Sequence, residues 1–496
     1  MSLIQVNHLT FGYEGSYETI FDHVTFQMDT NWKLGFIGRN GRGKTTFLNL
    51  LLGRYSYQGT IHASVDFEYF PFKVPDPSKL TIEVMEEMDP QLESWKIYKE
   101  LNLLDVSEDV MYRPFETLSH GEQMKLLLAS LFSRKNCFLL IDEPTNHMDE
   151  ETRKRIAVYL NQKKGFILVS HDRWLLDQVV DHIISINKSG IEIQKGNFSS
   201  WQENKERQDQ MELSQNERLK GEIRRLEEAA RRTSAWSDQT EKTKIGGKQS
   251  NGFRPDRGYI GHKAAKMMKR SKTMEKRQET AVQEKSKLLK NIETADALKV
   301  FPLSHHAKRL VEAKDLVAVY DGREICEPLN FEICQGDRIA LSGKNGCGKS
   351  SILKMILGEE IHRKGNLELA SKLKISYVSQ ETDHLSGMLQ EYARTQNLDE
   401  ALFRSMLRKL DFSRSCFDRK LEELSAGQKK KILLAASLCT QAHLYIWDEP
   451  LNYIDVLSRI QIEELIEEYQ PTLLFVEHDQ VFRQKAATKV VEVVRK

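Results

Sequence analysis

The chain has 496 residues, of which 40% are hydrophobic, and a formal net charge of +1, so we expect two or three globular domains. Its six cysteines form no C-x-x-C pair and no signal-peptide pattern opens the sequence, which predicts a cytoplasmic protein without a zinc site or disulfide framework. No apolar run approaches the ~20 residues that span a bilayer, which argues against a membrane domain and a transporter function.

A glycine-rich loop between an apolar strand and a helix is predicted in the segment WKLGFIGRNGRGKTTFLNLLL. The loop fits the phosphate-binding pattern G-x-x-x-x-G-K-[ST] with Gly38, Gly43, Lys44 and Thr45. Backbone N–H groups of such a loop bind phosphate, the lysine reaches the β- and γ-phosphates, and the threonine hydroxyl binds Mg²⁺. We therefore predict a nucleotide site that also includes Asn40, Gly41 and Thr46.

Three further segments of this first module carry polar residues at strand or helix ends. FLLIDEP ends a strand with Asp142, which suits the Mg²⁺ shell, and Glu143, which suits a general base that orients the attacking water. LSHGEQ starts a helix with Ser119 and Gly121, a second phosphate cradle, for which a plain N-cap is the alternative. His171 follows the strand FILVS, where it would sense a γ-phosphate; a structural histidine is the alternative.

This order of motifs resembles that of an ATP-binding-cassette ATPase domain. Such domains work as head-to-tail pairs, so the resemblance implies that the phosphate loop of one cassette faces the LSxGx serine of another, with ATP between them. It also implies that Asn146 and Asp149 form the loop that crosses between the two sites. Tyr13 would stack on adenine, for which a core aromatic is the alternative.

The next hundred residues, 201–303, show no sign of a globular core and predict a helical linker. From Gln202 to about Arg232 there is one glycine and no proline, and apolar residues recur at helical spacing at Leu219, Ile223, Leu226 and Ala230. From about His262 to Glu293 there is neither glycine nor proline, and apolar residues recur every seven positions at Met267, Met274, Ala281 and Leu288. We predict an antiparallel hairpin with arms of roughly 45–50 Å; an inert coiled-coil spacer is the alternative.

The predicted turn of this hairpin, about 233–261, is basic and contains aromatic residues. Residues 231–277 carry 14 Lys/Arg and 4 Asp/Glu, a net charge of +10 that leaves −9 for the rest of the chain. Its cations would bind phosphates and its rings would stack on RNA bases; the candidates are Trp236, Lys244, Lys248, Phe253, Arg254, Arg257 and Tyr259. A solvated helical face explains the charge equally well. A disordered polar loop with incidental aromatic residues is the alternative to an RNA-binding tip.

The motifs of the first module return in the last two hundred residues. The corresponding residues are Tyr320, Gly343, Asn345, Gly346, Gly348, Lys349, Ser350, Ser351, Ser425, Gly427, Asp448, Glu449 and His478. Four motifs lie 305 to 307 residues after their first copies, which indicates an internal duplication. Ser350 and Asp448 are thus predicted to bind Mg²⁺, Glu449 to act as general base and His478 to repeat the role of His171.

The two copies differ at one position near the catalytic groups. KISYVSQ supplies Gln380, where cassette ATPases use glutamine near the metal and the attacking water, whereas FEYFPF places Phe72 there. Head-to-tail pairing would build one site from Lys44, Thr45, Asp142, Glu143, His171 and Ser425. The other would use Lys349, Ser350, Gln380, Asp448, Glu449, His478 and Ser119. Because phenylalanine binds neither metal nor water through its side chain, we predict slower hydrolysis at the first site.

Two cassettes, no membrane domain and a basic helical linker resemble the ABC-F family of cytoplasmic, ribosome-binding ATPases. The resemblance covers essentially the whole chain and is closest to the Lsa group of antibiotic-resistance proteins, in DTNWKLGFIGRNGRGKTT, VDFEYFPF and the long linker. It implies contacts with the exit-tRNA site, P-site tRNA and 23S rRNA, and displacement of lincosamides, pleuromutilins and group A streptogramins from the peptidyl-transferase centre. The short interval between Phe72 and Ser119 leaves no room for a sizeable extra arm, which weakens a match to the housekeeping translation-factor branch.

We therefore predict an α/β protein with two P-loop cassettes, residues 1–200 and 304–496, that pair within one chain and are joined by the helical hairpin 201–303. Its substrate would be ATP with Mg²⁺, hydrolysed at two composite sites. Three alternatives remain: a translation factor that relieves stalled ribosomes without a drug, a DNA-associated ATPase, and the ATPase subunit of an exporter. The last needs a membrane partner and leaves the linker tip without a role.

Overall fold

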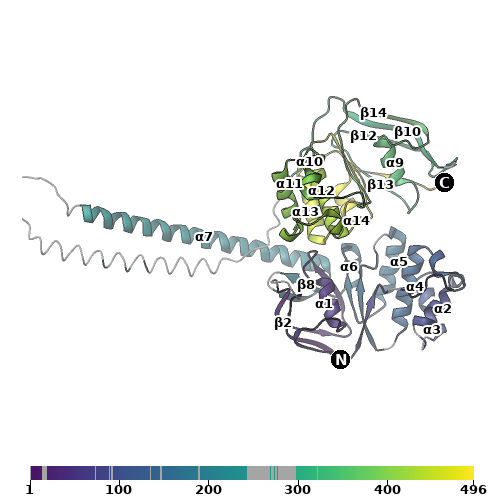
Figure 1. The fold of residues 1–496 in the computed structure, drawn as a ribbon, viewed down its shortest axis with the longest axis horizontal. Helices are drawn as coiled ribbons and strands as arrows, with labels where there is room; N and C mark the ends of the chain where they lie inside the picture. Colours follow the sequence, from purple (N-terminus) through teal and green to yellow (C-terminus); the bar gives the residue numbers. More distant parts are fainter. Residues whose placement is uncertain are drawn as a thin grey trace, which may run out of the picture. The chain divides into compact units, whose positions relative to one another are not determined.

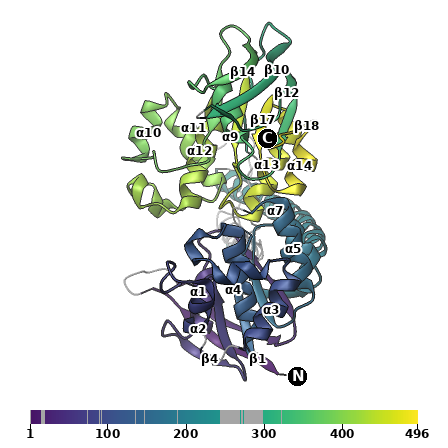
Figure 2. The ribbon, with the colours of Figure 1, turned by 90° about the vertical axis from the view of Figure 1, so that its right-hand side faces the viewer.

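The computed structural model describes the chain apart from residues 1, 14–18, 73, 89, 91–92, 135, 146–147, 188–189, 243–268, 270–272, 274–275, 277–297 and 321. The chain divides into two compact units, Met1–Trp201 with Ala295–Lys496, and Gln202–Thr294. The first unit holds two α/β cassettes, coloured purple to blue and green to yellow in Figures 1 and 2. Among the helices that are described, none is long and apolar enough to cross a membrane.

The first cassette is built on a six-stranded sheet with the order β5 (Asp66–Phe70), β6 (Cys137–Asp142), β7 (Phe166–Val169), β3 (Lys33–Gly38), β8 (His182–Asn187) and β9 (Gly190–Lys195). The first five strands are parallel and β9 is antiparallel to β8. The central strands are buried on both faces, as all four residues of β7 show, which is why they lack an alternating pattern. An antiparallel sheet adds β2 (Phe21–Asp29), β1 (Leu3–Phe11) and β4 (Gln58–His62).

Three helices of this cassette begin at capping residues in or beside the predicted motifs. Ser119 caps α4 (His120–Ser133) in a capping box with Glu122, Asp149 caps α5 (Glu150–Asn161), and Asp172 caps α6 (Arg173–Val179). The N-cap alternative for Ser119 is therefore realised in the structure. The other helices are α1 (Lys44–Leu51), α2 (Thr81–Met88), α3 (Ser94–Leu103) and the 3₁₀ turns η1 (Glu108–Tyr112) and η2 (Phe115–Thr117).

The second cassette repeats this plan, which confirms the predicted fold class and duplication. Its parallel sheet has the order β15 (Ile375–Val378), β16 (Leu444–Asp448), β17 (Leu473–Val476), β13 (Arg338–Ser342) and β18 (Lys489–Glu492), matching β5-β6-β7-β3-β8. The antiparallel strands are β10 (Arg309–Tyr320), β11 (Arg323–Glu324), β12 (Leu329–Cys334) and β14 (Arg363–Leu369). The helices are α9 (Lys349–Ile356), α10 (Leu389–Thr395), α11 (Glu400–Lys409), α12 (Ala426–Cys439), α13 (Val456–Tyr469) and α14 (Gln480–Ala486), with 3₁₀ turns η3 (Arg414–Cys416) and η4 (Leu421–Glu423).

The two kinds of structure in the second cassette occupy different sides of it. Strands β10, β12 and β14 lie on one side, and helices α10, α11 and α12 lie on the other (Figures 1 and 2). Loops that follow parallel strands meet at one edge of a sheet, which is where α/β proteins place their ligands.

Helix α7 (Phe198–Lys242) is longer than the sequence analysis predicted. Residues 233–242 are helical rather than part of the turn, because TSAWSDQTEK contains neither glycine nor proline. Its 45 residues correspond to roughly 68 Å at 1.5 Å per residue. Ion pairs one turn apart, such as Lys205 with Asp209 at 3.0 Å and Arg224 with Glu228 at 3.1 Å, support a helix that is largely exposed.

The rest of the predicted hairpin lies mostly outside the described residues. Lys269, Thr273 and Lys276 are described and helical, in the range predicted for the returning arm. Of the tip candidates, Trp236 lies in α7, while Lys244, Lys248, Phe253, Arg254, Arg257 and Tyr259 lie outside the described residues. The antiparallel pairing of the two arms stays a prediction.

Within the first unit, the two cassettes contact each other through α13. Val456 at its start belongs to the hydrophobic core of the first cassette, and Leu457 and Ile460 pack against that core. Deeper in this contact, the Arg173 guanidinium of α6 donates to both carboxylate oxygens of Glu463, with Nη1–Oε2 at 3.0 Å. Both side chains are at most 3% exposed, so this ion pair joins the cassettes away from water.

Removing Glu463 should destabilise the chain strongly, because the buried Arg173 guanidinium then keeps only Asp479, at 3.8 Å, as a carboxylate partner. Such losses are about 3–5 kcal/mol. We expect Glu463→Ala to lower the melting midpoint of the nucleotide-free protein by roughly 6 °C or more. The control is Glu467→Ala, an exposed glutamate on the same helix. Equal melting midpoints for the two variants would show that the pair does not hold the cassettes together.

Candidate functional site

The first phosphate loop connects β3 to α1 and is shaped by its glycines. Gly43 has φ of +95°, and a Cβ at this position would lie 2.6 Å from Ile20, so a larger residue does not fit. The Lys44 ammonium is buried and donates to the carbonyl oxygens of Gly38 at 2.7 Å and Arg39 at 3.3 Å. Burial lowers the pKa of Lys44. The loop therefore holds a cation among its own carbonyls, poised for a phosphate.

The second phosphate loop has the same construction between β13 and α9. Lys349 Nζ donates to the carbonyl oxygens of Gly343 and Lys344, both at 2.9 Å. Cys347 Sγ is buried at 3.9 Å from the same ammonium. The predicted members Asn345, Gly346, Gly348, Ser350 and Ser351 line one cavity of about 400 Å³ together with Tyr320, Lys349, Gln380 and Glu449.

Each cassette brings a hydroxyl next to an aspartate, half-buried at Asp142 and buried at Asp448, as a Mg²⁺ site requires. Thr45 Oγ1 donates to Asp142 Oδ2 at 3.4 Å, and Ser350 hydrogen-bonds to Asp448. Burial raises the pKa of Asp142, and that of Asp448 to about 6. Asp448 Oδ1 is buried without a hydrogen-bond partner among the described residues. An orphaned carboxylate oxygen beside a hydroxyl fits a hard cation that prefers oxygen ligands.

The two predicted general bases share a strained backbone but differ in their surroundings. Glu143 and Glu449 have φ of +49° and +46°, unusual values for residues other than glycine that cluster at functional sites. Each lies near the predicted histidine of its own cassette: His171 Nε2 is 3.4 Å from Glu143 Oε1, and His478 Nε2 is 3.6 Å from Glu449 Oε1. The structure therefore places each predicted glutamate beside the predicted histidine of its cassette.

Hydrogen-bond donors distinguish these carboxylates. Gln380 Nε2 donates to Glu449 Oε2 at 2.9 Å, and Asn452 Nδ2 donates to the same atom at 2.5 Å. Although burial opposes it, donation by His478 and Asn452 lowers the pKa of Glu449. Burial raises the pKa of Glu143 to about 8, and its Oε1 has no hydrogen-bond partner among the described residues. Phe72, in the place of Gln380, packs against the hydrophobic core of its cassette.

One composite site is assembled from both cassettes. A cavity of about 810 Å³ is lined by Asn40, Gly41, Lys44, Thr45, Asp142, Glu143 and His171 from the first cassette and by Ser425 and Gly427 from the second. Asn40 Nδ2 donates to the Tyr453 carbonyl across this junction at 2.8 Å. The six residues grouped from the sequence for the first site therefore lie around one cavity.

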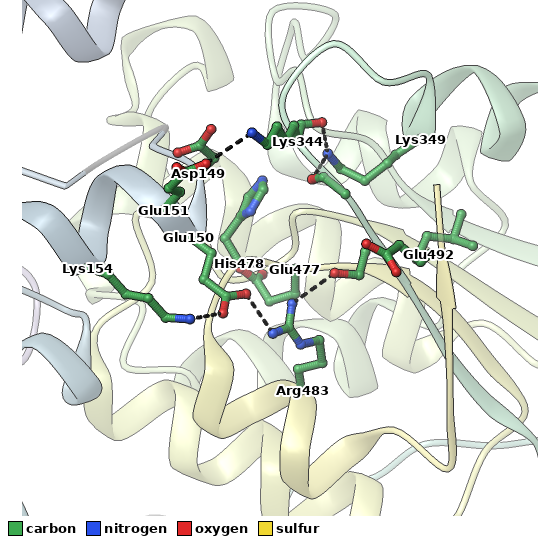
Figure 3. Close-up of a pocket in the computed structure, with 13 residues that line it drawn as sticks. Asp149, Glu150, Glu151, Lys154, Lys344, Lys349, Glu477, His478, Arg483 and Glu492 are labelled. Atoms are coloured by element: carbon green, nitrogen blue, oxygen red, sulfur yellow. Dashed lines mark hydrogen bonds and ion pairs between the residues drawn. The ribbon is translucent and has the colours of Figure 1, made fainter. Parts of the chain in front are cut away.

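The second phosphate loop meets a different part of its partner cassette. A cavity of about 270 Å³ beside it is lined by Asp149, Glu150, Glu151, Lys344, Lys349, His478 and Arg483, among others (Figure 3). Lys344 pairs with Glu151 at 3.0 Å and Arg483 with Glu150 at 2.8 Å. Ser119 and Gly121 line neither this cavity nor the 400 Å³ one. The structure thus gathers the first composite site around one cavity, whereas the LSxGx serine lines neither cavity beside the second phosphate loop.

The two predicted adenine-stacking tyrosines lie beside their phosphate loops. Tyr13 OH is 2.8 Å from Thr46 Oγ1, and Tyr320 OH is 3.1 Å from Ser351 Oγ. Both rings are more than 40% exposed, which leaves a face open for stacking. Tyr55, which the sequence analysis did not single out, contacts the Tyr13 ring edge-on at 5.8 Å. Tyr55 could have been found from the sequence by its position just after the phosphate-loop helix.

The sequence analysis missed two arginines near the sites, of which Arg153 contacts both cassettes. Arg153 contacts Asp172 at 3.4 Å in its own cassette and donates to the His478 carbonyl of the other at 3.2 Å. Arg459 contacts Asp479 at 3.0 Å. Each follows its cassette's capping aspartate by four residues, so the repeat itself was a usable signal. Asp149 caps α5 as described, whereas Asn146 lies outside the described residues.

Fold and site together define a P-loop ATPase with two cassettes in one chain. A family model described as "ABC transporter" matches residues 21–146 and 326–452, slightly more than half of the chain. The chain therefore belongs to the ABC transporter family of ATPases and, within it, to the ABC-F type that the sequence resembles.

The matches to relatives extend over nearly the full length of this chain. The ribosome protection protein VmlR of Bacillus subtilis is 28% identical over 487 residues, which cover 95% of this chain and 84% of that protein. The erythromycin resistance ATP-binding protein MsrA of Staphylococcus epidermidis is 27% identical, covering 93% and 92%. ABC transporter F family member 2 of Arabidopsis thaliana is 26% identical, covering 99% and 76%. The archaeal ribosome recycling factor aABCE1, in its crystal complex with stalk protein aP1, shares the fold with a TM-score of 0.62 at 20% identity, covering 98% and 89%.

The different surroundings of the two general bases predict unequal turnover. We expect Glu449→Gln to lower ATP turnover roughly tenfold or more, because general bases contribute about 10²–10⁴-fold. Glu143→Gln should change it less than about twofold, since that site lacks the glutamine. Steady-state phosphate release measures both, with nucleotide binding as the control for intact sites. A larger loss from Glu143→Gln would reverse the assignment.

Proposed function

We propose that this ATPase binds the ribosome in the cytoplasm and protects it from antibiotics. In this proposal the segment between the cassettes displaces lincosamides, pleuromutilins and group A streptogramins from the peptidyl-transferase centre. The composite cavity that holds Lys44 of one cassette and Ser425 of the other carries the proposal, because a nucleotide bound there contacts both cassettes. Similarity to proteins named for ribosome protection and for erythromycin resistance supports the choice of target.

Within each site the chain's own residues divide the work. Lys44 and Lys349 bind the phosphates, Thr45 with Asp142 and Ser350 with Asp448 hold Mg²⁺, and Gln380 completes the second metal site. Mg²⁺ at these positions neutralises phosphate charge. Glu143 and Glu449 orient the attacking water and accept its proton, while His171 and His478 hold the carboxylates in place. Tyr13 and Tyr320 stack on adenine.

ATP acts on conformation through differential binding. Its phosphates are contacted by one cassette's loop and by Ser425 or Ser119 of the other only when the two cassettes are close, so ATP favours that state. Hydrolysis removes the γ-phosphate, so the nucleotide no longer favours the state in which the cassettes are close. The ATP-favoured state fits the exit-tRNA site, and the basic linker tip then contacts 23S rRNA and the P-site tRNA. Lys244, Lys248, Arg254 and Arg257 supply charge there, and Trp236, Phe253 and Tyr259 supply stacking surfaces.

A translation factor that relieves stalled ribosomes without a drug is the second candidate. The chain is comparably similar to ABC transporter F family member 2, whose name does not refer to antibiotic resistance. This similarity favours retaining the translation-factor function as a candidate. Both candidates use the same ATPase sites. They differ in whether the linker tip changes drug susceptibility.

Blocking hydrolysis at both sites should trap the ribosome-bound state. With ATP, Glu143→Gln/Glu449→Gln should co-sediment with ribosomes in a larger fraction than the unmodified chain, and ADP should abolish the difference. Duplex DNA in place of ribosomes is the control for the DNA-associated alternative. Recovery of the double variant in the ribosome-free fraction with ATP would count against the proposal.

Expression of the chain should raise the concentrations of a pleuromutilin and a lincosamide needed to inhibit growth by roughly fourfold or more, corresponding to about 0.8 kcal/mol in the drug's apparent affinity. A variant with residues 233–261 replaced by a glycine-serine segment should lose this effect and keep its ATPase activity. If both chains protect equally, the tip has no role in protection. If neither protects but both rescue stalled ribosomes, the second candidate is correct.

A further inference from the structure

A lysine is buried under the second catalytic site. Lys430 on α12 is 1% exposed, yet among the described residues its ammonium has only carbonyl oxygens, and no carboxylate, as direct partners. It donates to the carbonyl oxygens of Ser379 at 2.7 Å and Asp448 at 3.1 Å, and lies 3.5 Å from that of Gln380. Burying an ammonium is costly, and the carbonyls offset only part of that cost. Burial accordingly lowers the pKa of Lys430 to about 8.

These carbonyls mark the ends of two neighbouring strands. Ser379 and Gln380 follow β15, and Asp448 ends β16, which is paired with β15 in parallel register. The same residues carry the catalytic side chains, because the Gln380 amide donates to Glu449 Oε2 and Asp448 faces Ser350. The ammonium thus ties together the backbone from which the polar groups of the second site project.

The first cassette has an apolar counterpart at both positions. Met124 corresponds to Lys430 at the same distance from the signature serine, and Phe72 corresponds to Gln380. Met124 belongs to the hydrophobic core of its cassette, and Phe72 packs against that core. Within one duplicated chain the two positions are therefore both polar or both apolar, as expected if one side chain depends on the other.

We propose that Lys430 is a positioning residue for ATP hydrolysis at the second site: it fixes the Gln380 backbone so that the Gln380 amide reaches Glu449. Met124 and Phe72 are then the matching pair of a site without this support. The inference rests on the roles proposed for Gln380 and Glu449. Basal ATPase activity tests it without ribosomes or antibiotics, so its outcome is independent of ribosome protection.

A double-mutant cycle tests whether Lys430 acts through Gln380. In a Glu143→Gln background, where only the second site turns over, we compare Lys430→Met, Gln380→Phe and the combination. We expect each single change to lower kcat roughly tenfold, the scale of a misplaced catalytic group, with KM for ATP changed less than about threefold. The combination should be no slower than Gln380→Phe alone, because Lys430 has nothing left to position.

Two controls separate positioning from general damage. Lys429→Met removes the neighbouring charge from the same helix and should leave kcat within about twofold. The combined variant recreates the apolar pair of the first cassette, so it should fold and melt near the parent even where Lys430→Met alone does not. Multiplicative losses in the combined variant, or an unchanged kcat for Lys430→Met in a folded protein, would overturn the proposal.

Discussion

Both nucleotide sites depend on an ammonium group held by the carbonyls of its own phosphate loop. Lys44 and Lys349 are buried, and each donates to two carbonyl oxygens of the loop that precedes it. The loop reaches this shape because glycine occupies its left-handed positions. Parallel strands then deliver the remaining groups to the same sheet edge, so one geometric constraint explains why Asp142, Glu143 and His171 meet there although they are far apart in sequence.

The duplication gives two sites with one plan and different chemistry. The first is assembled across both cassettes, but Phe72 stands where the second has Gln380, which donates to Glu449. The second has the better-supported base, yet Ser119 does not line its cavities. Its catalytic groups are thus ready within one cassette and await the partner's serine. Closure of the second site, rather than the composition of its base, is the step that ATP would have to drive.

The sequence predicted the sites well where a motif carries its own chemistry. Phosphate loops, the Asp-Glu strand ends and the duplicated register all appear in the structure as local patterns predict. Lys430 could not be found this way, because its role depends on which carbonyls the fold brings within reach, and for Arg153 and Arg459 the repeat marked the positions but not the contacts. The predicted end of α7 was wrong for a simpler reason. The polar composition of residues 233–242 was interpreted as a turn, although these residues contain neither glycine nor proline. Polar composition alone therefore does not mark where a helix ends.

Two contacts between the cassettes differ in how deeply they are buried. Arg173 with Glu463 is buried, and its counterparts by the repeat, Gln480 and Ala157, cannot form an ion pair. Gln480 and Arg483 instead contact Glu150, which is about one third exposed. The side chains of Arg483 and Glu150 are 18% and 34% exposed, so this pair separates at a lower cost than a fully buried pair, whose breaking costs about 3–5 kcal/mol. Of these two contacts, the one beside the second phosphate loop therefore separates at the lower cost. The site with the supported base is thus also the site whose partner contacts can be exchanged most readily.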